Sequence, residues 1–501
     1  MVSGGLSKKI IQRQPRTTYL FKESLILLLA FDHVDRTGFR WLISGTKGEI
    51  EAVRFRSLDT HQPARVRPAF FSTRARIGVQ SVILRLILPL SEVVALAPAG
   101  HYKTSHFVIV RGTFPTEGTM ASDFPPPPVD SIDWNNVGFK VREVNGHVES
   151  HFSHAGGGTW SEPRFVASPH LQIHGMAPGL NYGQQAYEGM KAFRAPPQQQ
   201  GSKITIFRPH RNAGRMQRSA DFVSIPRVPE EHFLKCVNLA VAANAGFVPP
   251  HETGAAMYIR PLVFGSGAQL GLTPGDEYTF VVFVMPTGVY HGVHGVDALV
   301  LEDFDRAAPE GTGSAKVGGN YAPVLRHSQR AYAEKYGITL HLDSKTRSEI
   351  DEFSTSAFIG VRKGNDGSVT LVTPDSKNVI ESVTAASVCD IAASVFGYKV
   401  EKRRIPYEEL PEFAEVFAAG TAAALVPIKS ITMVSKNDKF AFDVGADESG
   451  GEVCQLLLKT LKGIQNGTVE DKFGWNVEVT APPKGFVDGA GDVNASATSV
   501  P

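Results

Sequence analysis

One lysine, Lys316, lies within a run of glycines and small residues that extends from Gly311 to Tyr321. A surface lysine needs no such neighbours, whereas a lysine that attacks a carbonyl must sit in a tight, partly desolvated turn where its amine loses a proton easily. Glycines allow backbone shapes and close ligand approach that side chains would block. Lys316 is therefore a candidate Schiff-base lysine, which would require a phosphate cradle and a carboxylate for a pyridinium ring elsewhere in the chain.

Glu352 is the candidate carboxylate. It stands directly before Phe353 and a run of small and apolar residues, so the sequence predicts that it is buried. A buried carboxylate is costly unless it meets a positive partner. A protonated pyridine nitrogen is such a partner, and the pairing keeps the ring an electron sink. A lone glutamate is more often a capping or surface residue, but a Schiff-base lysine in the same chain favours the cofactor role.

Two segments and one arginine are candidates for the phosphate cradle. The segment from Ser382 to Thr384 leads into a predicted helix, whose free backbone N–H groups and dipole favour an anion. The turn from Ala419 to Ala422 would bring further N–H groups and a hydroxyl to the same oxygens. Arg215 would supply a fixed positive charge. Ordinary helix caps and paired surface arginines give the same patterns, so each feature is weak by itself.

The composition indicates a globular chain whose partners are small molecules. Its 501 residues are 42% hydrophobic and 20% charged, which suffices for a large core divided among several domains. Lys and Arg number 51 against 50 Asp and Glu, which removes the global electrostatic case for a nucleic-acid partner. Cys236, Cys389 and Cys454 are far apart and lack CxxC spacing, which argues against disulfides and a zinc site. We expect no metal.

Strand-like and helix-like patterns alternate from Trp134 onward, which indicates an α/β or α+β body. Short apolar runs predict the strands, and helical periodicity or capping residues predict the helices. The expected strands are Ile204–Phe207, Tyr278–Met285, Ala298–Leu301, Ile338–Leu342 and Val369–Val372. The expected helices are Pro229–Ala243, Ala322–Tyr336 and Thr384–Phe396, the last with Thr384 as its cap.

The first 120 residues or so are rich in arginine and poor in acids. Of their two apolar runs, Leu25–Phe31 is too short for a membrane span, and Val79–Ala99 is interrupted by charged residues and a proline. We expect no transmembrane helix and no membrane partner. The basic start is consistent with organelle targeting, diluted by early acidic residues, and the alternative is a natural start at Met120. The expected compartment is the cytoplasm or the mitochondrion.

Several separated motifs follow one another along the chain. They are Tyr187-Glu188-Gly189-Met190-Lys191-Ala192-Phe193, Phe207-Arg208-Pro209, Tyr258-Ile259-Arg260-Pro261, Lys316-Val317-Gly318-Gly319-Asn320-Tyr321 and Gly420-Thr421-Ala422. In order and spacing they resemble the branched-chain amino-acid aminotransferases, from about residue 134 to about residue 475. This family belongs to the fold-type IV pyridoxal-phosphate enzymes. The resemblance implies a smaller N-terminal α/β domain, a larger C-terminal domain, pyridoxal 5′-phosphate between them, and usually a homodimer.

The resemblance also implies a role for individual residues. Lys316 would form the internal aldimine and shuttle the proton between the substrate α-carbon and cofactor C4′, while Tyr321 and Glu352 would bind the phenolic oxygen and the pyridine nitrogen. The other expected cofactor-binding residues are Arg215, Val383, Thr384, Gly420 and Thr421, with Val383 and Thr384 acting through backbone N–H groups. The expected substrate-binding residues are Tyr182, Tyr187, Tyr258, Arg260, Tyr290 and Ala422, with Arg260 handling the side-chain carboxylate of glutamate.

The implied activity is transamination of leucine, isoleucine and valine with 2-oxoglutarate, which gives branched-chain 2-oxo acids and L-glutamate by a ping-pong route through Lys316. One alternative is another fold-type IV activity, such as a D-amino-acid or amine transaminase or an aminodeoxychorismate lyase. Another is a non-catalytic paralogue that binds the cofactor. Intact Lys316, Tyr321 and Glu352 speak against the paralogue, because a protein relieved of chemistry has no need for that set.

The sequence departs from the family pattern at several positions. Ala357 stands where the family has an asparagine, and the usual Gly-Val-x-Arg string reads Ser382-Val383-Thr384-Ala385. Backbone contacts survive such changes, so they bear on substrate preference and turnover more than on cofactor binding. Ala423 and Val426 replace the CxxC redox pair of some animal members, so we expect no thiol switch of that kind.

The expected organisation has four parts. Residues 1–133 form a poorly structured extension that ends in a stiff proline-rich linker. Residues 134–289 form the small α/β domain, and residues 290–475 the large cofactor-binding domain. Residues 476–501, rich in Ala, Gly, Ser, Pro and Thr, form a flexible tail.

Overall fold

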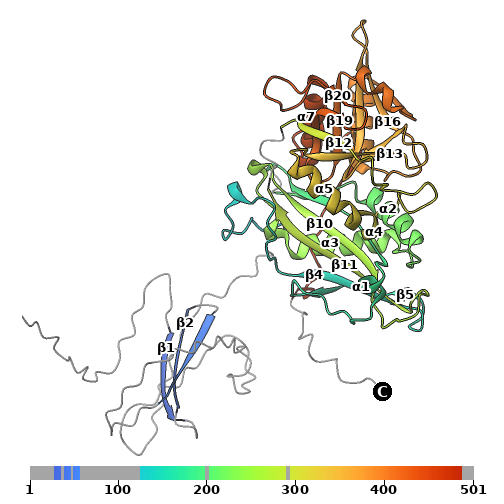
Figure 1. Ribbon diagram of the computed structural model, residues 1–501. Coiled ribbons are helices and arrows are strands. Elements are labelled where there is room, and N and C mark those ends of the chain that lie inside the picture. Colours follow the sequence, from blue (N-terminus) through green and yellow to red (C-terminus); the bar gives the residue numbers. More distant parts are fainter. Residues whose placement is uncertain are drawn as a thin grey trace, which may run out of the picture. The chain divides into compact units, whose positions relative to one another are not determined.

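The computed structural model describes residues 124–197, 202–288 and 294–487, and the backbone of three strands within residues 27–56. The chain divides into two compact units, residues 1–118 and 119–501 (Figure 1). In the first unit, β1 (Leu27–Val34), β2 (Phe39–Thr46) and β3 (Glu49–Arg56) form an antiparallel sheet in that order. Our prediction of a poorly structured extension missed these strands, although the two residues between β2 and β3 are typical hairpin spacing.

The second unit begins with the small domain, whose sheet runs in the order β21-β9-β8-β10-β11-β4-β5, with β6 paired to β4 and β7 to β10. The strand pairs are antiparallel. The strands are β4 (His147–Ser153), β5 (Thr159–Trp160), β6 (Arg164–Val166), β7 (Gln185–Tyr187), β8 (Met190–Arg194), β9 (Ile204–Phe207), β10 (Ala256–Gly265), β11 (Glu277–Thr287) and β21 (Asn476–Glu478). The helices are α1 (Pro178–Asn181), α2 (Pro209–Phe222) and α3 (Glu230–Ala243).

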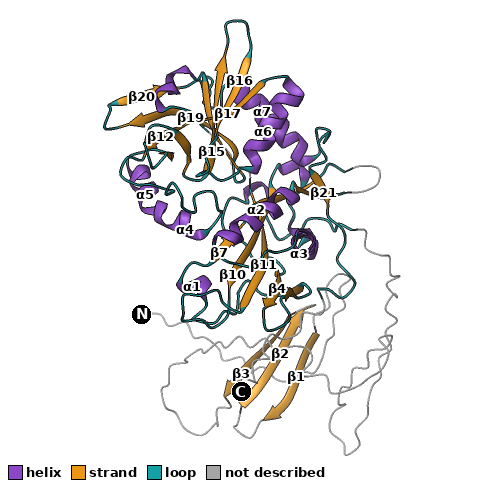
Figure 2. Ribbon diagram, turned by 90° about the vertical axis from the view of Figure 1, so that its right-hand side faces the viewer, coloured by secondary structure: helices purple, strands orange, loops and turns teal. Residues whose placement is uncertain are grey.

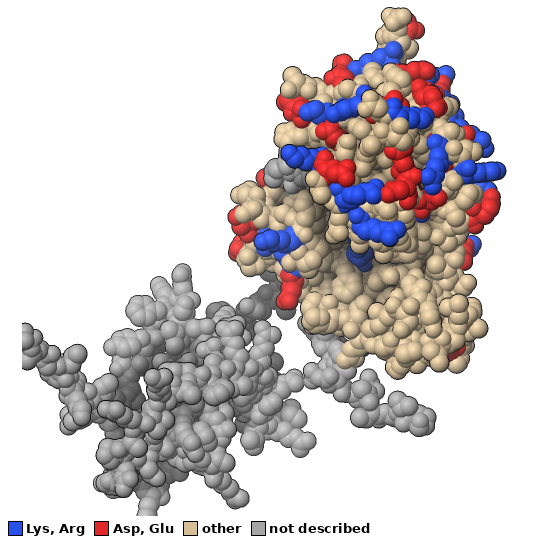
Figure 3. Space-filling model, in the orientation of Figure 1, with Lys and Arg blue, Asp and Glu red and all other residues tan. Residues whose placement is uncertain are grey.

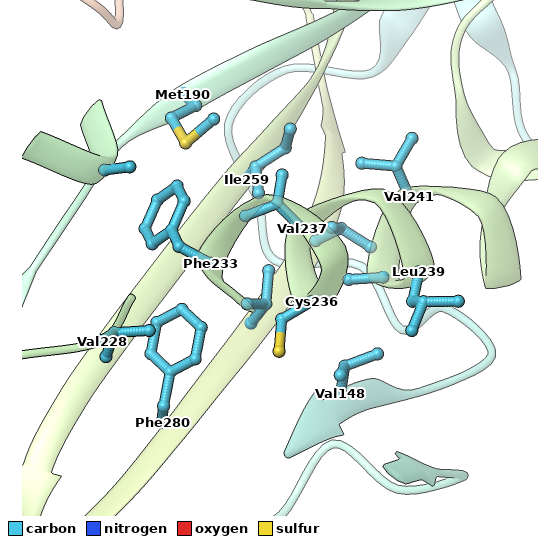
Figure 4. Close-up of a cluster of buried hydrophobic side chains, with 14 of the residues drawn as sticks. Val148, Met190, Val228, Phe233, Cys236, Val237, Leu239, Val241, Ile259 and Phe280 are labelled. Atoms are coloured by element: carbon cyan, nitrogen blue, oxygen red, sulfur yellow. The ribbon is translucent and has the colours of Figure 1, made fainter. Parts of the chain in front are cut away.

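Helix α3 carries the core of the small domain. Its apolar residues recur at helical spacing, so Phe233, Val237 and Val241 point toward the sheet and are fully buried against it (Figure 4). Ile259 from β10 and Phe280 from β11 complete this cluster. The predicted helix Pro229–Ala243 is confirmed, with Pro229 in the N-cap position and two glutamates in the first turn.

The large domain is built on a second sheet in the order β14-β13-β12-β19-β18-β15-β16-β17. Because β14 also pairs with β15, the strands from β14 to β15 close into a ring around an apolar interior. The strands are β12 (Val296–Val300), β13 (Ile338–Leu342), β14 (Ile350–Phe353), β15 (Ser356–Lys363), β16 (Val369–Pro374), β17 (Lys399–Arg403), β18 (Glu415–Gly420), β19 (Ala424–Met433) and β20 (Asp438–Ala441). The helices are α4 (Gly318–Tyr321), α5 (Leu325–Ala333), α6 (Val383–Phe396) and α7 (Glu452–Asn466).

All five predicted strands correspond to β9, β11, β12, β13 and β16, with ends that differ by a few residues. Two helices differ more. The predicted helix 322–336 starts as a 3-10 turn, and its α-helical part, α5, ends at Ala333. Two residues later, Lys335 adopts a left-handed φ of 70°. Helix α6 starts at Val383 with Ser382 as its cap, two residues before the predicted Thr384 cap. Ser382 is the cap because its side-chain oxygen accepts a hydrogen bond from the Ala385 N–H at 3.1 Å.

Two predicted boundaries also need correction. Residues 124–133 pack on the small domain: Phe124 contacts its core, and the Val129 N–H donates to the Gly246 carbonyl at 2.8 Å. The chain after residue 475 returns to the small domain as β21, and Val479 is buried there. The tail therefore does not begin at residue 476, and residues 488–501 lie outside the described part. The predicted boundary at 289/290 also lies outside the described residues.

Charges of both signs are interspersed over the large domain, whereas they are sparse over the lower part of the small domain on the same face (Figure 3). Among the described residues, we find no helix of sufficient length and hydropathy to span a membrane. The described side chains likewise contain no cluster of three potential metal ligands.

Candidate active site

A cavity of about 400 Å³, including the part that opens to solvent, lies where helix α2 of the small domain meets the large domain. Segments that are far apart in the sequence line it, and most of the predicted cofactor-binding residues are among them. The lining residues are Arg215, Arg306, Lys316, Tyr321, Glu352, Thr355, Ser356, Ala357, Ile380, Ser382, Val383, Ala419, Gly420 and Thr421.

Lys316 is held from both sides by the small domain. Its backbone N–H donates to Ser219 Oγ at 2.9 Å, and its carbonyl accepts the Tyr187 N–H at 3.1 Å. The side chain is partly buried, and Nζ donates to the Tyr321 hydroxyl at 3.1 Å. Nζ also lies 4.6 Å from the centroid of the Tyr187 ring, close enough for a cation–π contact. The predicted catalytic amine therefore points into the cavity from a fixed backbone.

The glycines around Lys316 serve close packing rather than unusual backbone angles. Throughout the described segment 311–321, no residue has a positive φ. A Cβ on Gly313 would lie 2.3 Å from Ala307 Cβ and 2.4 Å from the Asn378 carbonyl oxygen, and one on Gly318 would lie 2.9 Å from Gln185 Nε2. Gly313 therefore excludes a side chain, whereas a side chain at Gly318 would require Gln185 to shift.

Tyr321 lies between positive groups. Burial alone would raise the pKa of its hydroxyl, but the charges of Lys316 and Arg306 and the hydrogen bond from Lys316 together lower it. Its neighbour Tyr187, whose ring centroid is 5.3 Å away, shows the opposite shift because burial and Tyr321 raise its pKa. Of the two tyrosines, Tyr321 is therefore the one suited to stabilise negative charge on a ligand oxygen.

Glu352 is buried at the end of β14, next to a residue that sequence reasoning missed. Arg306 Nη1 approaches Glu352 Oε1 to 2.5 Å, yet Oε1 has no hydrogen bond of acceptable geometry within the described chain. Burial raises the pKa of Glu352 to about 7, and the arginine only partly opposes this. The sequence signal for Arg306 was a charged residue followed by two alanines in the stretch that leads to Lys316. We call Lys316, Tyr321, Glu352 and Arg306 the ring end of the cavity.

The opposite end is formed by the first turn of α6. The Ala385 N–H donates to Ser382 Oγ at 3.1 Å, and the Ala386 N–H donates to the Ser382 carbonyl at 3.0 Å. In the described structure, the N–H groups of Val383 and Thr384 have no such partner. These two free donors at a helix N-terminus are suited to an anion, as predicted. Thr421 also lines this end, with Oγ1 donating to the Gly189 carbonyl at 3.3 Å. We call Ser382, Val383, Thr384 and Thr421 the phosphate end.

Arg215 reaches the cavity from α2 but is already paired. Its Nε and Nη2 each donate to Glu188 at 2.7 Å, and its Nη1 donates to the Glu381 carbonyl at 2.8 Å. Glu188 is fully buried and also accepts from Asn212. Burial alone would lower the pKa of Arg215, but Glu188 outweighs it and raises that pKa. A guanidinium has five N–H donors, so two are left for a ligand. Sequence reasoning missed Glu188 as the partner.

The predicted substrate-binding residues do not line this cavity themselves. Tyr187 and Tyr258 lie beside it with Arg260, whose Nη2 donates to the Tyr258 hydroxyl at 2.9 Å. Tyr182 points elsewhere, and its hydroxyl donates to the Leu270 carbonyl at 2.6 Å. The Ala422 carbonyl accepts Lys191 Nζ at 2.7 Å, and burial with nearby Lys462 lowers the pKa of Lys191 to about 8. Tyr290 lies outside the described residues.

Known proteins with the same pattern decide the family. Residues 185–431 match the model of "Amino-transferase class IV". Aminotransferase poxL of Penicillium oxalicum is 55% identical over 360 residues, which cover 72% of this chain and 96% of that protein. The chain belongs to the class IV aminotransferases.

Two further relatives of this class IV aminotransferase are informative. The branched-chain amino acid aminotransferase gloG of Glarea lozoyensis is 49% identical over 368 residues, which cover 72% of this chain and all of that protein. The crystal structure of the Escherichia coli branched-chain amino acid aminotransferase matches with a TM-score of 0.53 and 25% identity, over 63% of this chain and 97% of that one. The predicted fold-type IV architecture with two domains is confirmed.

Class IV aminotransferases use pyridoxal 5′-phosphate, and the cavity of this class IV aminotransferase fits that cofactor. Lys316 presents an amine for the aldehyde carbon, and Tyr321 a hydroxyl with a lowered pKa for the phenolic oxygen. The buried Glu352 Oε1 contacts Arg306 but has no hydrogen bond of acceptable geometry in the described chain, which suits a protonated ring nitrogen. The free N–H groups of Val383 and Thr384 suit the phosphate.

Proposed function

We propose that this class IV aminotransferase transfers the amino group of leucine, isoleucine or valine to 2-oxoglutarate. The observation that supports this most is the wall beside Lys316. The Arg260 guanidinium carbon lies 5.2 Å from the centroid of the Tyr187 ring, and Lys316 Nζ lies 4.6 Å from the same centroid. The ring of Tyr187 is therefore next to both the reacting amine and the Arg260 guanidinium.

This wall suits a site that must accept an apolar and an acidic amino acid in turn. The rings of Tyr187 and Tyr258 offer apolar surface for a branched side chain, while their hydroxyls stay available. Arg260 is exposed, and within the described chain its guanidinium meets only tyrosines, with no carboxylate in salt-bridge range. It is thus free to bind the side-chain carboxylate of glutamate or 2-oxoglutarate at little desolvation cost.

The residues of the ring end have separate tasks in the proposed reaction. Pyridoxal 5′-phosphate, when bound, supplies the aldehyde that takes up the amino group and the ring that withdraws electrons from the substrate α-carbon. Lys316, held by Ser219 and Tyr187, is placed to remove and return a proton at that carbon. Glu352, buried at the ring end beside Arg306, would hold a proton on the ring nitrogen.

The relatives support the substrate class by name only. One curated relative and the crystallised E. coli relative are named as branched-chain amino acid aminotransferases, whereas the name of aminotransferase poxL gives no substrate. A panel of donors separates the candidates. Initial rates with L-leucine, L-isoleucine and L-valine and 2-oxoglutarate should exceed those with D-alanine or a simple chiral amine at least tenfold. The reverse order would overturn the proposal, and absent exchange of the leucine α-proton would favour the non-catalytic paralogue.

The Arg260→Gln variant tests the wall directly. Loss of a charge-assisted contact to a carboxylate costs about 1.5–3 kcal/mol, so kcat/KM for 2-oxoglutarate should fall about 10- to 100-fold. The leucine half-reaction, followed from the cofactor spectrum in single turnovers, should change less than about threefold. Arg227→Gln, which removes an exposed arginine paired with Asp221 on the same domain, is the matched control. Equal losses in both half-reactions would contradict the assignment of Arg260.

We also propose that the enzyme acts as a homodimer. Leu270 and Leu272 are 76% and 83% exposed, and Tyr182, also exposed, is tied to this loop by its hydrogen bond to the Leu270 carbonyl. Large exposed apolar side chains that lie close together are typical of an interface. Light scattering should give twice the chain mass. The Leu270→Ser, Leu272→Ser double variant should shift the chain toward the monomer, and an unchanged mass would refute this surface.

A further inference from the structure

Helix α2 of the small domain carries a row of arginines that faces the N-terminal end of α6 from the large domain. Arg211, Arg215 and Arg218 lie three or four positions apart on α2, and this spacing places them on one side of the helix. Arg208, the N-cap of α2, extends the row. Figure 2 shows α2 directly beneath α6 at the junction of the two domains.

Three of these arginines converge on one residue, Glu381. Arg218 Nη2 donates to Glu381 Oε2 at 2.6 Å, and Arg211 Nη2 donates to Glu381 Oε1. Arg215 Nη1 donates to the backbone carbonyl of the same residue at 2.8 Å. Glu381 directly precedes Ser382, the cap of α6, and stands two residues before the free N–H of Val383.

A second contact continues the row along α6. Arg208 Nη1 donates to Ser387 Oγ at 2.8 Å and pairs with Asp390 at 3.2 Å. The first turns of α6 are therefore held against α2 at both ends of the row. Arg215 and the Val383 N–H, which face the same cavity, belong to different domains, and Glu381 joins the elements that carry them.

The ion pairs of Glu381 with Arg211 and Arg218 are too exposed to contribute much to folding stability. The side chains of Arg211, Arg218 and Glu381 are each about half exposed, at 49%, 55% and 49%. Exposed pairs of this kind contribute about 0–1 kcal/mol to folding. Simple electrostatics also makes Glu381 unfavourable here, because a carboxylate two residues from a phosphate site repels the anion. A carboxylate at this place is useful only if it fixes geometry.

We propose that Glu381 is a positioning residue: by binding the arginines of α2, it sets the distance between Arg215 and the N-terminus of α6, and so forms the two-domain phosphate site. The proposal rests on cofactor binding alone and holds whichever amino acid the enzyme transaminates. The proposal predicts that phosphate affinity falls when the negative charge of Glu381 is removed. If Glu381 acted only through its charge, the same change would raise phosphate affinity.

The experiment compares cofactor binding by the cofactor-free chain and its variants. Binding of pyridoxal 5′-phosphate is titrated by absorbance, and pyridoxal, which lacks the phosphate, is titrated in parallel. Glu381→Gln and Glu381→Ala should raise the Kd for pyridoxal 5′-phosphate about three- to twentyfold and change the Kd for pyridoxal less than twofold. The control is Asp221→Asn. Asp221 also lies on α2, but its exposed ion pair is with Arg227 and does not involve α6, so this variant should change neither Kd more than twofold.

Each outcome decides the proposal. Tighter or unchanged binding of pyridoxal 5′-phosphate by Glu381→Gln overturns it, and so does an equal loss for pyridoxal, which would indicate a general structural role. Should the Glu381→Gln and Glu381→Ala variants lower the melting temperature by more than Asp221→Asn does, Glu381→Asp takes their place. It keeps the negative charge and shortens the side chain that reaches Arg211 and Arg218, so positioning predicts the same phosphate-specific loss, and an unchanged Kd overturns the proposal. Failed transamination with unchanged cofactor binding would count against the proposed function only.

Discussion

The two ends of the cavity are built in different ways. The ring end consists of interacting charged and hydroxyl side chains, with Glu352 and Arg306 buried and Lys316 and Tyr321 partly buried. The phosphate end offers backbone N–H groups of a helix terminus, with a serine cap at its start. One end depends on which residues are present, and the other depends mainly on where the backbone runs.

This difference explains where the sequence departs from its family. Ser382 and Ala385 replace the usual glycine and arginine at the phosphate end, yet the helix still begins at Val383 and still offers two N–H donors. No such substitution is found among Lys316, Tyr321 and Glu352. A side-chain site loses its chemistry with one substitution, whereas a backbone site tolerates any residue that keeps the helix start. Substitutions at the two ends should therefore differ in size.

The largest effect is expected from Lys316→Ala at the ring end. The variant lacks the amine that we propose reacts with the cofactor and moves the substrate proton, so the rate of transamination should fall at least about a thousandfold. The bound cofactor should also lose the spectrum of its lysine-linked form. Lys345→Ala, an exposed lysine of the same domain, serves as the control. Activity above about a tenth of the parent rate would remove Lys316 from the catalytic role.

Glu352→Gln should give the second-largest effect. Without a carboxylate at the ring nitrogen, turnover should fall about a hundredfold, which corresponds to about 2.7 kcal/mol of transition-state stabilisation.

The same variant tests a pH dependence of stability in the cofactor-free chain. Burial raises the pKa of Glu352 from 4.5 to about 7, so the folded state binds this proton more tightly than the unfolded state. The stabilising contribution is complete below pH 4.5 and is lost as the pH rises through 7. Between pH 5 and pH 8, the free energy of unfolding in urea should fall by about 2–3 kcal/mol more in the parent than in Glu352→Gln. Equal losses would mean that the carboxyl has an ordinary pKa.

Ser382→Ala addresses the phosphate end and should have a smaller effect. The variant loses the cap on the Ala385 N–H, which costs about 1 kcal/mol of helix stability. The Val383 and Thr384 N–H groups are still present, so the Kd for pyridoxal 5′-phosphate should rise only about two- to fivefold. Ser382→Thr restores a capping oxygen and should recover most of the affinity. A loss as large as that of Glu352→Gln would refute the distinction between the two ends.

Sequence reasoning reached the ring end because residue type carries its chemistry. Lys316 stood out among small residues, and Glu352 stood out before a buried run, so both could be assigned a role. Arg306 and Glu188 were missed because their roles arise from pairing. Arg306 matters through Glu352, and Glu188 through Arg215, and each pair joins segments 27 or more residues apart. Only the folded chain brings them together.

The fold shows the same limit. Apolar runs predicted β9 and β13 because strand residues are consecutive in the sequence. The return of the chain as β21 could not be predicted in this way, since its three residues are partly exposed and gain their order only by pairing with β9. The sequence does not distinguish Ser382 from Thr384 as the helix cap, because both hydroxyls precede the same apolar stretch. In the fold, the Ala385 N–H donates to Ser382 Oγ, which identifies Ser382 as the cap.

The smallest effect is expected from Thr421→Val, which keeps the shape of the side chain and removes only its hydroxyl. Thr421 Oγ1 donates to the Gly189 carbonyl across a long 3.3 Å, and such a bond contributes at most about 0.5–0.8 kcal/mol net. The Kd for pyridoxal 5′-phosphate should therefore rise no more than about two- to fourfold, while Thr421→Ser should match the parent chain. If Thr421→Val instead weakened binding more than tenfold, the hydroxyl would be a principal phosphate ligand. The phosphate end would then depend on side chains in the same way as the ring end.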